Sequence, residues 1–108
     1  MDMAADLMDN PLVLLQKIVA GDGEAFRRFY DLYASLVFTF AIRVLGSRSD
    51  AEDLLQEVFL QVWRQAQSYS PERGSPEAWL ITMTRSRAID KLRSLRRRDM
   101  SPLSPDEP

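Results

Sequence analysis

The chain has 108 residues, a formal net charge of −2, and neither cysteine nor histidine. This length suits one domain that buries its own core, and the missing residue types exclude thiol nucleophiles, histidine bases, disulfides and Cys/His metal sites. No phosphate-binding glycine loop, paired-carboxylate motif or metal-ligand spacing is present, so we expect no enzyme and no cofactor. Because no apolar run could span a bilayer and the N-terminus is acidic, we expect a cytoplasmic protein.

The charge is unevenly distributed along the chain. Residues 1–72 carry 6 basic and 11 acidic side chains, a net charge of −5. Residues 73–98 carry 8 basic and 2 acidic side chains, a net charge of +6, and residues 99–108 add three acidic ones. An acidic body followed by a basic element suggests two partners of opposite charge.

The first half of the chain predicts two helices. The first spans about residues 11–20, with Asn10 as its N-cap. The second spans about residues 23–45 and is closed by Gly46. Its wide, aromatic apolar face predicts that it forms the centre of a helical bundle. That face comprises Phe26, Phe29, Tyr30, Tyr33, Leu36, Val37, Phe40, Ala41 and Val44.

A third helix is predicted from a capping box, Ser49 followed by Glu52, to about Ala66. Its core face comprises Ala51, Leu54, Leu55, Val58, Phe59, Val62 and Trp63. A second stripe at the same spacing lies at its back and comprises Asp53, Gln56, Glu57, Leu60 and Arg64. An acidic stripe with one apolar residue is typical of a docking surface for a basic partner. An ordinary solvated face is the alternative, since single exposed leucines are common.

A loop is predicted over QSYSPERGS, because Pro71 and Gly74 oppose helix. Ser75 then caps a fourth helix that begins at Pro76 and runs to about residue 98. Its expected core contacts are Ile81, Ala88, Leu92 and Leu95. The opposite face carries Trp79, Thr82, Met83, Ser86, Asp90, Arg93 and Arg97, flanked by Arg87 and Lys91, with Arg96 and Arg98 near the end.

This polar face and the preceding Tyr69 are typical of a single-strand nucleic-acid site. Arginines hold phosphates, aromatic rings stack on bases, and small polar groups read base edges. In the alternative, Trp79 and Met83 pack on another helix and the arginines only favour the helix C-terminus. The final SPLSPDEP, with its three prolines, predicts a linker.

The span from about residue 12 to residue 98 resembles region two, the N-terminal domain of the extracytoplasmic-function sigma factors in the bacterial sigma-70 family. The matching stretches, in the family's order and spacing, are GDGEAFRRFYDLYASLVFTFAIRVLG, DAEDLLQEVFLQVWR and GSPEAWLITMTRSRAIDKLRSLRRR. The resemblance implies an all-α compact bundle of about four helices. It also implies binding to core RNA polymerase, recognition and melting of the minus-ten promoter element, and control by an anti-sigma factor.

The resemblance assigns roles to both polar faces. Asp53, Gln56 and Glu57 match the family's DLxQE motif, which contacts the coiled-coil clamp helices of the beta-prime subunit, with Leu60 and Arg64 on the same face. The loop around Tyr69 and the helix from Trp79 to Arg93 match elements that capture a flipped base of the non-template strand. The DNA-binding residues expected are Tyr69, Trp79, Thr82, Arg85, Ser86, Arg87, Asp90, Lys91, Arg93, Arg96 and Arg97. Ser86 departs from the family pattern, where many members have Asn.

Residues 1–98 are therefore expected to form region two, and residues 99–108 a Pro-rich linker toward a second domain absent from this chain. Family members carry a helix-turn-helix domain there, so we expect a longer protein. Two functions of other classes stay open. A stand-alone DNA-binding regulator would place the fourth helix in a duplex groove, and a protein-interaction module would use only the acidic stripe.

Overall fold

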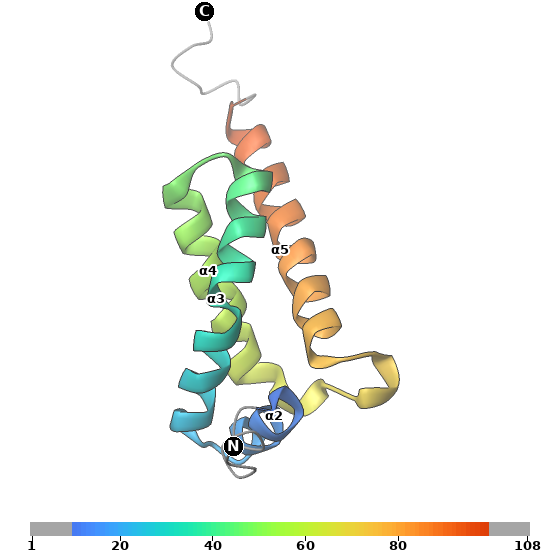
Figure 1. Cartoon of the computed structure of the whole chain (residues 1–108). Coiled ribbons are helices and arrows are strands. Elements are labelled where there is room, and N and C mark those ends of the chain that lie inside the picture. The colour runs from blue at the N-terminus through green and yellow to red at the C-terminus, as the bar shows by residue number, and fades with distance from the viewer. Residues whose placement is uncertain (1–9, 100–108) are drawn as a thin grey trace, which may run out of the picture.

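A computed structural model describes residues 10–99 of the chain, and the regular structure of this part is entirely helical (Figure 1). This confirms the predicted all-α fold. The elements are α2 (Pro11–Val19), α3 (Gly23–Leu45), α4 (Arg48–Gln65), the short 3-10 helices η1 (Ala66–Ser68) and η2 (Pro71–Arg73), and α5 (Pro76–Asp99). The linker was expected over residues 99–108; Asp99 is the last residue of α5, and residues 100–108 lie outside the described residues.

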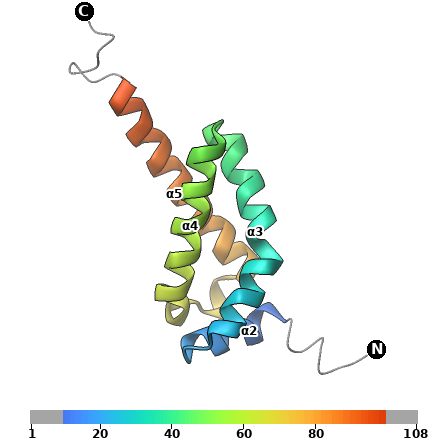
Figure 2. The ribbon, with the colours of Figure 1, turned by 90° about the vertical axis from the view of Figure 1, so that its left-hand side faces the viewer.

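The helices form a bundle in which α3 is central (Figures 1 and 2). α3 and α4 run antiparallel along each other, and α5 packs against both. α2 lies across the end of the bundle where α3 begins, and it contacts η1 and α5. Among the described residues, no helix is long and apolar enough to cross a membrane.

Side chains in the sequence determine where the helices begin and end. The Asn10 Oδ1 atom accepts a hydrogen bond from the Leu12 amide at 2.9 Å, and the Ser75 Oγ atom accepts one from the Ala78 amide at 3.1 Å. α3 ends at Gly46, whose φ of +71° lies in the left-handed region that closes a helix. The predicted ends of α2, α3 and α5 are confirmed to within a residue or two.

The predicted capping box of α4 was wrong. The helix begins at Arg48, and its N-cap is Ser47, whose Oγ atom accepts a hydrogen bond from the Asp50 amide at 3.3 Å. Ser47 has the extended backbone that an N-cap needs, whereas Ser49 is already inside the first turn. The expected loop also overlaps η1 and contains η2. Pro71 is compatible with η2 because it occupies the first helical position.

Aromatic packing joins α3 to α4. The Phe59 ring lies 6.4 Å from Phe26, 6.4 Å from Phe29 and 4.8 Å from Tyr30, measured between ring centroids. Trp63 stacks edge-on against Phe26 at 5.3 Å. The predicted core faces of these two helices are largely confirmed. The residues of α3 and α4 that are fully buried are Ala25, Phe29, Tyr33, Val37, Ala41, Ala51, Leu54, Val58, Phe59 and Val62, while Tyr30, Leu36 and Trp63 keep substantial exposure.

The predicted core face of α5 was partly wrong. Ala88 is buried as expected, but Ile81, Leu92 and Leu95 are only half-buried. The remaining buried residues of α5 are Leu80, Met83 and Thr84, so Met83 does not belong to the solvent face. The Thr84 hydroxyl donates to the Leu80 carbonyl at 2.8 Å, which satisfies it within its own helix and allows burial.

Tyr33 of α3 ties the central helix to the first turn of α5. Its side chain is almost fully buried, and Glu77 lies beside its hydroxyl. Burial, and secondly the negative charge of Glu77, raise the pKa of Tyr33 to about 12. Tyr33 thus places a phenol at the contact between α3 and the start of α5, and this phenol stays neutral to a higher pH than an exposed tyrosine does.

Replacing Phe59 by alanine removes the ring that joins three aromatic side chains of α3. We expect Phe59→Ala to lower the free energy of unfolding by about 3–5 kcal/mol. Leu60→Ala, at the adjacent but exposed position, should change it by less than about 0.5 kcal/mol. Urea unfolding followed by circular dichroism measures both, and similar losses would contradict the packing described.

The raised pKa of Tyr33 predicts a loss of stability at alkaline pH. An unfolded tyrosine ionises near pH 10, so the stabilisation from a neutral Tyr33 is complete below that pH and is lost as the pH approaches 12. Between these values the wild-type protein should lose about 2–3 kcal/mol more than Tyr33→Phe, since two pKa units separate the states. Urea unfolding at a series of pH values measures this. If the free energies of unfolding of the wild type and Tyr33→Phe fall equally across this range, the role of Tyr33 is refuted.

Candidate functional site

One face of α4 carries the predicted docking residues, hereafter the α4 stripe: Asp53, Gln56, Glu57, Leu60 and Arg64. All except Glu57 are classed as exposed, and Leu60 keeps 47% of its surface in solvent. The stripe faces outward because Phe59 and Val58 face inward. The outward orientation that the sequence predicts is confirmed, and an apolar side chain stands among acidic and amide groups.

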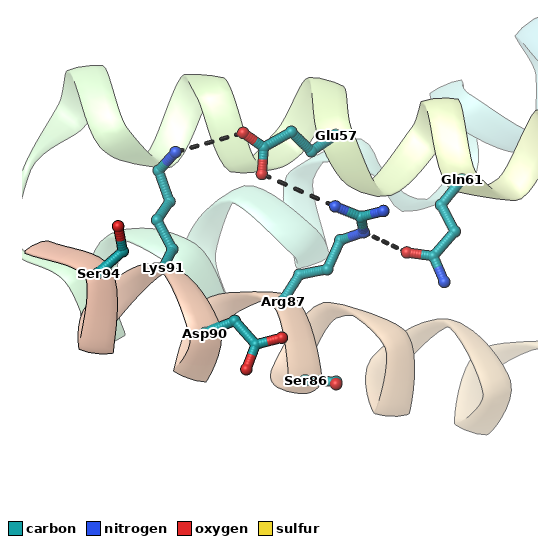
Figure 3. Close-up of a pocket in the computed structure, with 7 residues that line it drawn as sticks. All are labelled: Glu57, Gln61, Ser86, Arg87, Asp90, Lys91 and Ser94. Atoms are coloured by element: carbon teal, nitrogen blue, oxygen red, sulfur yellow. Dashed lines mark hydrogen bonds and ion pairs between the residues drawn. The ribbon is translucent and has the colours of Figure 1, made fainter.

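Glu57 is the member of the stripe that turns toward α5 (Figure 3). Its Oε2 atom lies 3.3 Å from the Lys91 Nζ atom, and its Oε1 atom lies 4.0 Å from the Arg87 Nη1 atom. The Glu57 side chain keeps 43% exposure, so it contacts α5 and solvent at once. It therefore sits at the boundary between the acidic face of α4 and the basic helix.

Gln61 completes this interhelical network one turn after Glu57. The Arg87 Nε atom donates a hydrogen bond to the Gln61 Oε1 atom. The Gln61 Nε2 atom in turn donates to the Gln65 Oε1 atom at 3.1 Å, so both ends of its amide are engaged. Gln61 was not among the predicted site residues, although its position four residues after Glu57 places the two on one side of the helix.

A groove of about 470 Å³ runs between α4 and α5 over this network. In Figure 3, Arg87 and Lys91 reach across to α4, whereas the side chains of Ser86 and Asp90 do not. The groove is lined by Glu57, Gln61, Ser86, Arg87, Asp90, Lys91 and Ser94. It combines two cations with two carboxylates, and no group of acidic side chains among the described residues could hold a metal ion.

The loop before α5 holds Tyr69 in a defined position. The Tyr69 hydroxyl donates to the Gly74 carbonyl at 2.8 Å, and its ring meets Trp79 edge-on at 5.6 Å between centroids. Both rings are half-buried, so each keeps one part in contact with solvent. Tyr69 also lines a cavity of about 210 Å³ between the loop and α2.

Most of the DNA-binding residues expected from the sequence share one side of α5, hereafter the α5 stripe: Trp79, Thr82, Ser86, Asp90, Arg93 and Arg97. Apart from the half-buried Trp79, these side chains are exposed. Arg85 and Arg96 are also exposed but fall on another side of the helix at its 3.6-residue period. Arg87 and Lys91 are directed at α4 instead, so the structure divides the expected cations of α5 into three groups.

Residues 29–98 of the chain match the family model described as Sigma-70 region 2. An ECF RNA polymerase sigma factor SigK of Mycobacterium sp. (strain KMS) is 44% identical over 82 residues, which cover 76% of this chain and 42% of that protein. The protein of the same name from Mycobacterium ulcerans (strain Agy99) is 41% identical over 86 residues, covering 80% and 46%. That from Mycobacterium tuberculosis (strain ATCC 25177 / H37Ra) is 40% identical over 80 residues, covering 74% and 43%.

The chain thus spans less than half the length of these relatives. The span matched by the family model includes all of α4 and nearly all of α5. Both stripes and the network that joins them therefore lie within the matched residues.

Proposed function

This chain belongs to the Sigma-70 region 2 family, and on that premise we propose that it binds core RNA polymerase and recognises and melts the minus-ten promoter element as a domain of an extracytoplasmic-function sigma factor. The observation that carries the proposal is the outward-facing α4 stripe, which presents Asp53, Gln56 and Glu57 of the DLxQE motif within the matched span. Family membership also agrees with the expectation that the chain is not an enzyme. The work proposed is binding, without a covalent step.

The proposed polymerase contact is the α4 stripe. Asp53 and Glu57 offer carboxylates to basic side chains of the clamp helices of the beta-prime subunit, and charge-assisted hydrogen bonds of this kind are the stronger ones. Leu60 stands exposed between them and the end of the helix, where it supplies the apolar contact that the centre of an interface needs. Gln56 and Arg64 extend the polar rim.

The proposed DNA contact is the α5 stripe together with Tyr69, Arg85 and Arg96. Extruding a base costs a few kcal/mol, and an aromatic side chain returns about 1–3 kcal/mol per stacked base. Arginine contacts to phosphates add a salt-dependent contribution. Because these values nearly balance, the domain should trap an opened strand while polymerase helps to open the duplex.

The geometry of the loop supports a role for Tyr69 in base capture. Its hydroxyl is held by the Gly74 carbonyl and its ring is braced by Trp79, so the ring needs little further ordering before a base stacks on it. The proposal extends to an anti-sigma factor as a regulatory partner and to the cytoplasm as the place of action. A stand-alone regulator or a pure protein-interaction module would each leave one of the two stripes unused.

Asp53→Ala should weaken binding to a clamp-helix fragment of beta-prime by about 1–3 kcal/mol. The melting temperature should hardly change, because Asp53 is exposed. Glu52→Ala is the matched control: it removes an exposed acid from the neighbouring position, outside the stripe. Isothermal titration calorimetry with thermal melting tests the pair, and the polymerase contact is refuted if Asp53→Ala binds like wild type or no worse than Glu52→Ala.

Tyr69→Ala should lose about 1–3 kcal/mol of affinity for the non-template strand of a minus-ten element, the value of one stacked base. Tyr69→Phe keeps the ring and loses only the bond to Gly74, so it should retain most of the affinity. Fluorescence anisotropy with the promoter strand, a scrambled strand and a duplex measures this. Equal wild-type affinity for the promoter and scrambled strands would exclude base capture.

Arg97→Ala should weaken binding to all of these strands alike. Loss of one phosphate contact reduces the dependence of log affinity on log salt by about 0.7 on the single strands and about 0.9 on the duplex. A salt series in the same anisotropy assay measures the slope. An unchanged slope would remove Arg97 from the DNA interface.

A further inference from the structure

The network between α4 and α5 joins the two stripes. A hollow of about 190 Å³ lined by Leu60 and Arg64 of the α4 stripe adjoins the larger groove, which is lined by Ser86 and Asp90 of the α5 stripe. Glu57, Gln61 and Arg87 line both. A change in the pairing of these three side chains therefore alters the surroundings of both the α4 stripe and the α5 stripe.

Two cations of the basic helix point inward to this network. Lys91 keeps only 19% of its side chain exposed and ends 3.3 Å from Glu57, while Arg87 is held by Glu57 and by the Gln61 amide (Figure 3). One carboxylate thus uses its two oxygens on two different cations. Gln65 fixes the orientation of the Gln61 amide and so helps to aim Arg87.

A carboxylate between a lysine and an arginine occupies the same donors that a DNA phosphate would use. While Glu57 holds them, Arg87 and Lys91 cannot give their full charge to a phosphate. Ion pairs with this much solvent exposure are weak, so the arrangement can be displaced. The contact is a restraint on the two cations and not a permanent part of the core.

We propose that Glu57, assisted by Gln61 as a positioning residue, is an internal phosphate mimic that withholds Arg87 and Lys91 from nucleic acid in the isolated domain. The inference rests on the proposed function, because it takes α5 as the DNA-binding helix. Since Glu57 also belongs to the α4 stripe, a basic group of a partner that takes its carboxylate releases both cations.

Removing the charge of Glu57 tests the restraint directly. Glu57→Gln should raise affinity for a single-stranded oligonucleotide by about three- to tenfold at low salt, as expected for one or two added phosphate contacts. The dependence of log affinity on log salt should steepen by about 0.7 to 1.4, because each phosphate neutralised on a single strand contributes about 0.7. Gln61→Ala, which loosens Arg87 alone, should steepen it by about 0.7.

Glu52→Gln is the matched control. It removes the same charge from the same helix and also breaks an ion pair, but with Arg48 of its own helix, 3.5 Å away. It should leave the salt slope unchanged. The double variant Glu57→Gln with Lys91→Gln should lose about half of the added slope, because one of the two released cations is then absent.

Fluorescence anisotropy over a salt series measures the affinity and the salt slope of each variant, and thermal melting checks that each variant is folded. The inference is overturned if Glu57→Gln and Glu52→Gln show the same slope, since the gain would then be an unspecific effect of net charge. Failure of the proposed function looks different: the wild-type protein would not distinguish promoter from scrambled strand. The slopes of the two glutamate variants would still report on the two cations in that case.

Discussion

The packing of Phe59 against three aromatic rings of α3 is the constraint on which the α4 surface depends. A helix is rigid, so burying one of its faces in the core sets its rotation about its own axis and thereby determines which face is exposed. Once Phe59 and the neighbouring Val58 face the core, Asp53 and Leu60 have no position except the outer surface. The outward orientation of the α4 stripe is thus a geometric consequence of how the core packs.

The placement of α5 has a different physical basis. Four of its side chains are buried and a few apolar ones, such as Trp79, are half-buried. Polar contacts supplement them: Glu77 near Tyr33 at one end, and Lys91 and Arg87 on Glu57 farther along. Apolar contacts are not subject to electrostatic screening, whereas exposed ion pairs are screened by salt and exchange with other ions. The C-terminal half of the basic helix is therefore the part of the bundle most open to influence from partners.

The sequence predicts most of this fold because caps and apolar periodicity are local. Asn10, Gly46 and Ser75 act as expected, and the core faces of α3 and α4 follow from spacing alone. The errors have physical causes: Ser47 and Ser49 both suit an N-cap, and only the backbone after Gly46 decides between them. The burial of Thr84 depends on a hydroxyl satisfied within its own helix. The outward stripes were predictable, but the pairing of Glu57 with Lys91 joins residues 34 positions apart and has no local signal.

The cost of extruding a base and the gain from stacking it nearly balance, which explains why the single carboxylate of Glu57, between the α4 stripe and the α5 stripe, can influence DNA affinity. If extruding a base costs about as much as stacking returns, the remaining affinity comes from a few phosphate contacts, and withholding two cations removes a large share of it. A partner that competes for Glu57 restores that share. Linkage makes the effect reciprocal: a strand that attracts Arg87 and Lys91 frees the Glu57 carboxylate, and so strengthens the binding of a basic partner by the same factor. The proposed polymerase and promoter contacts would then be coupled through one side chain, without any change in the helices.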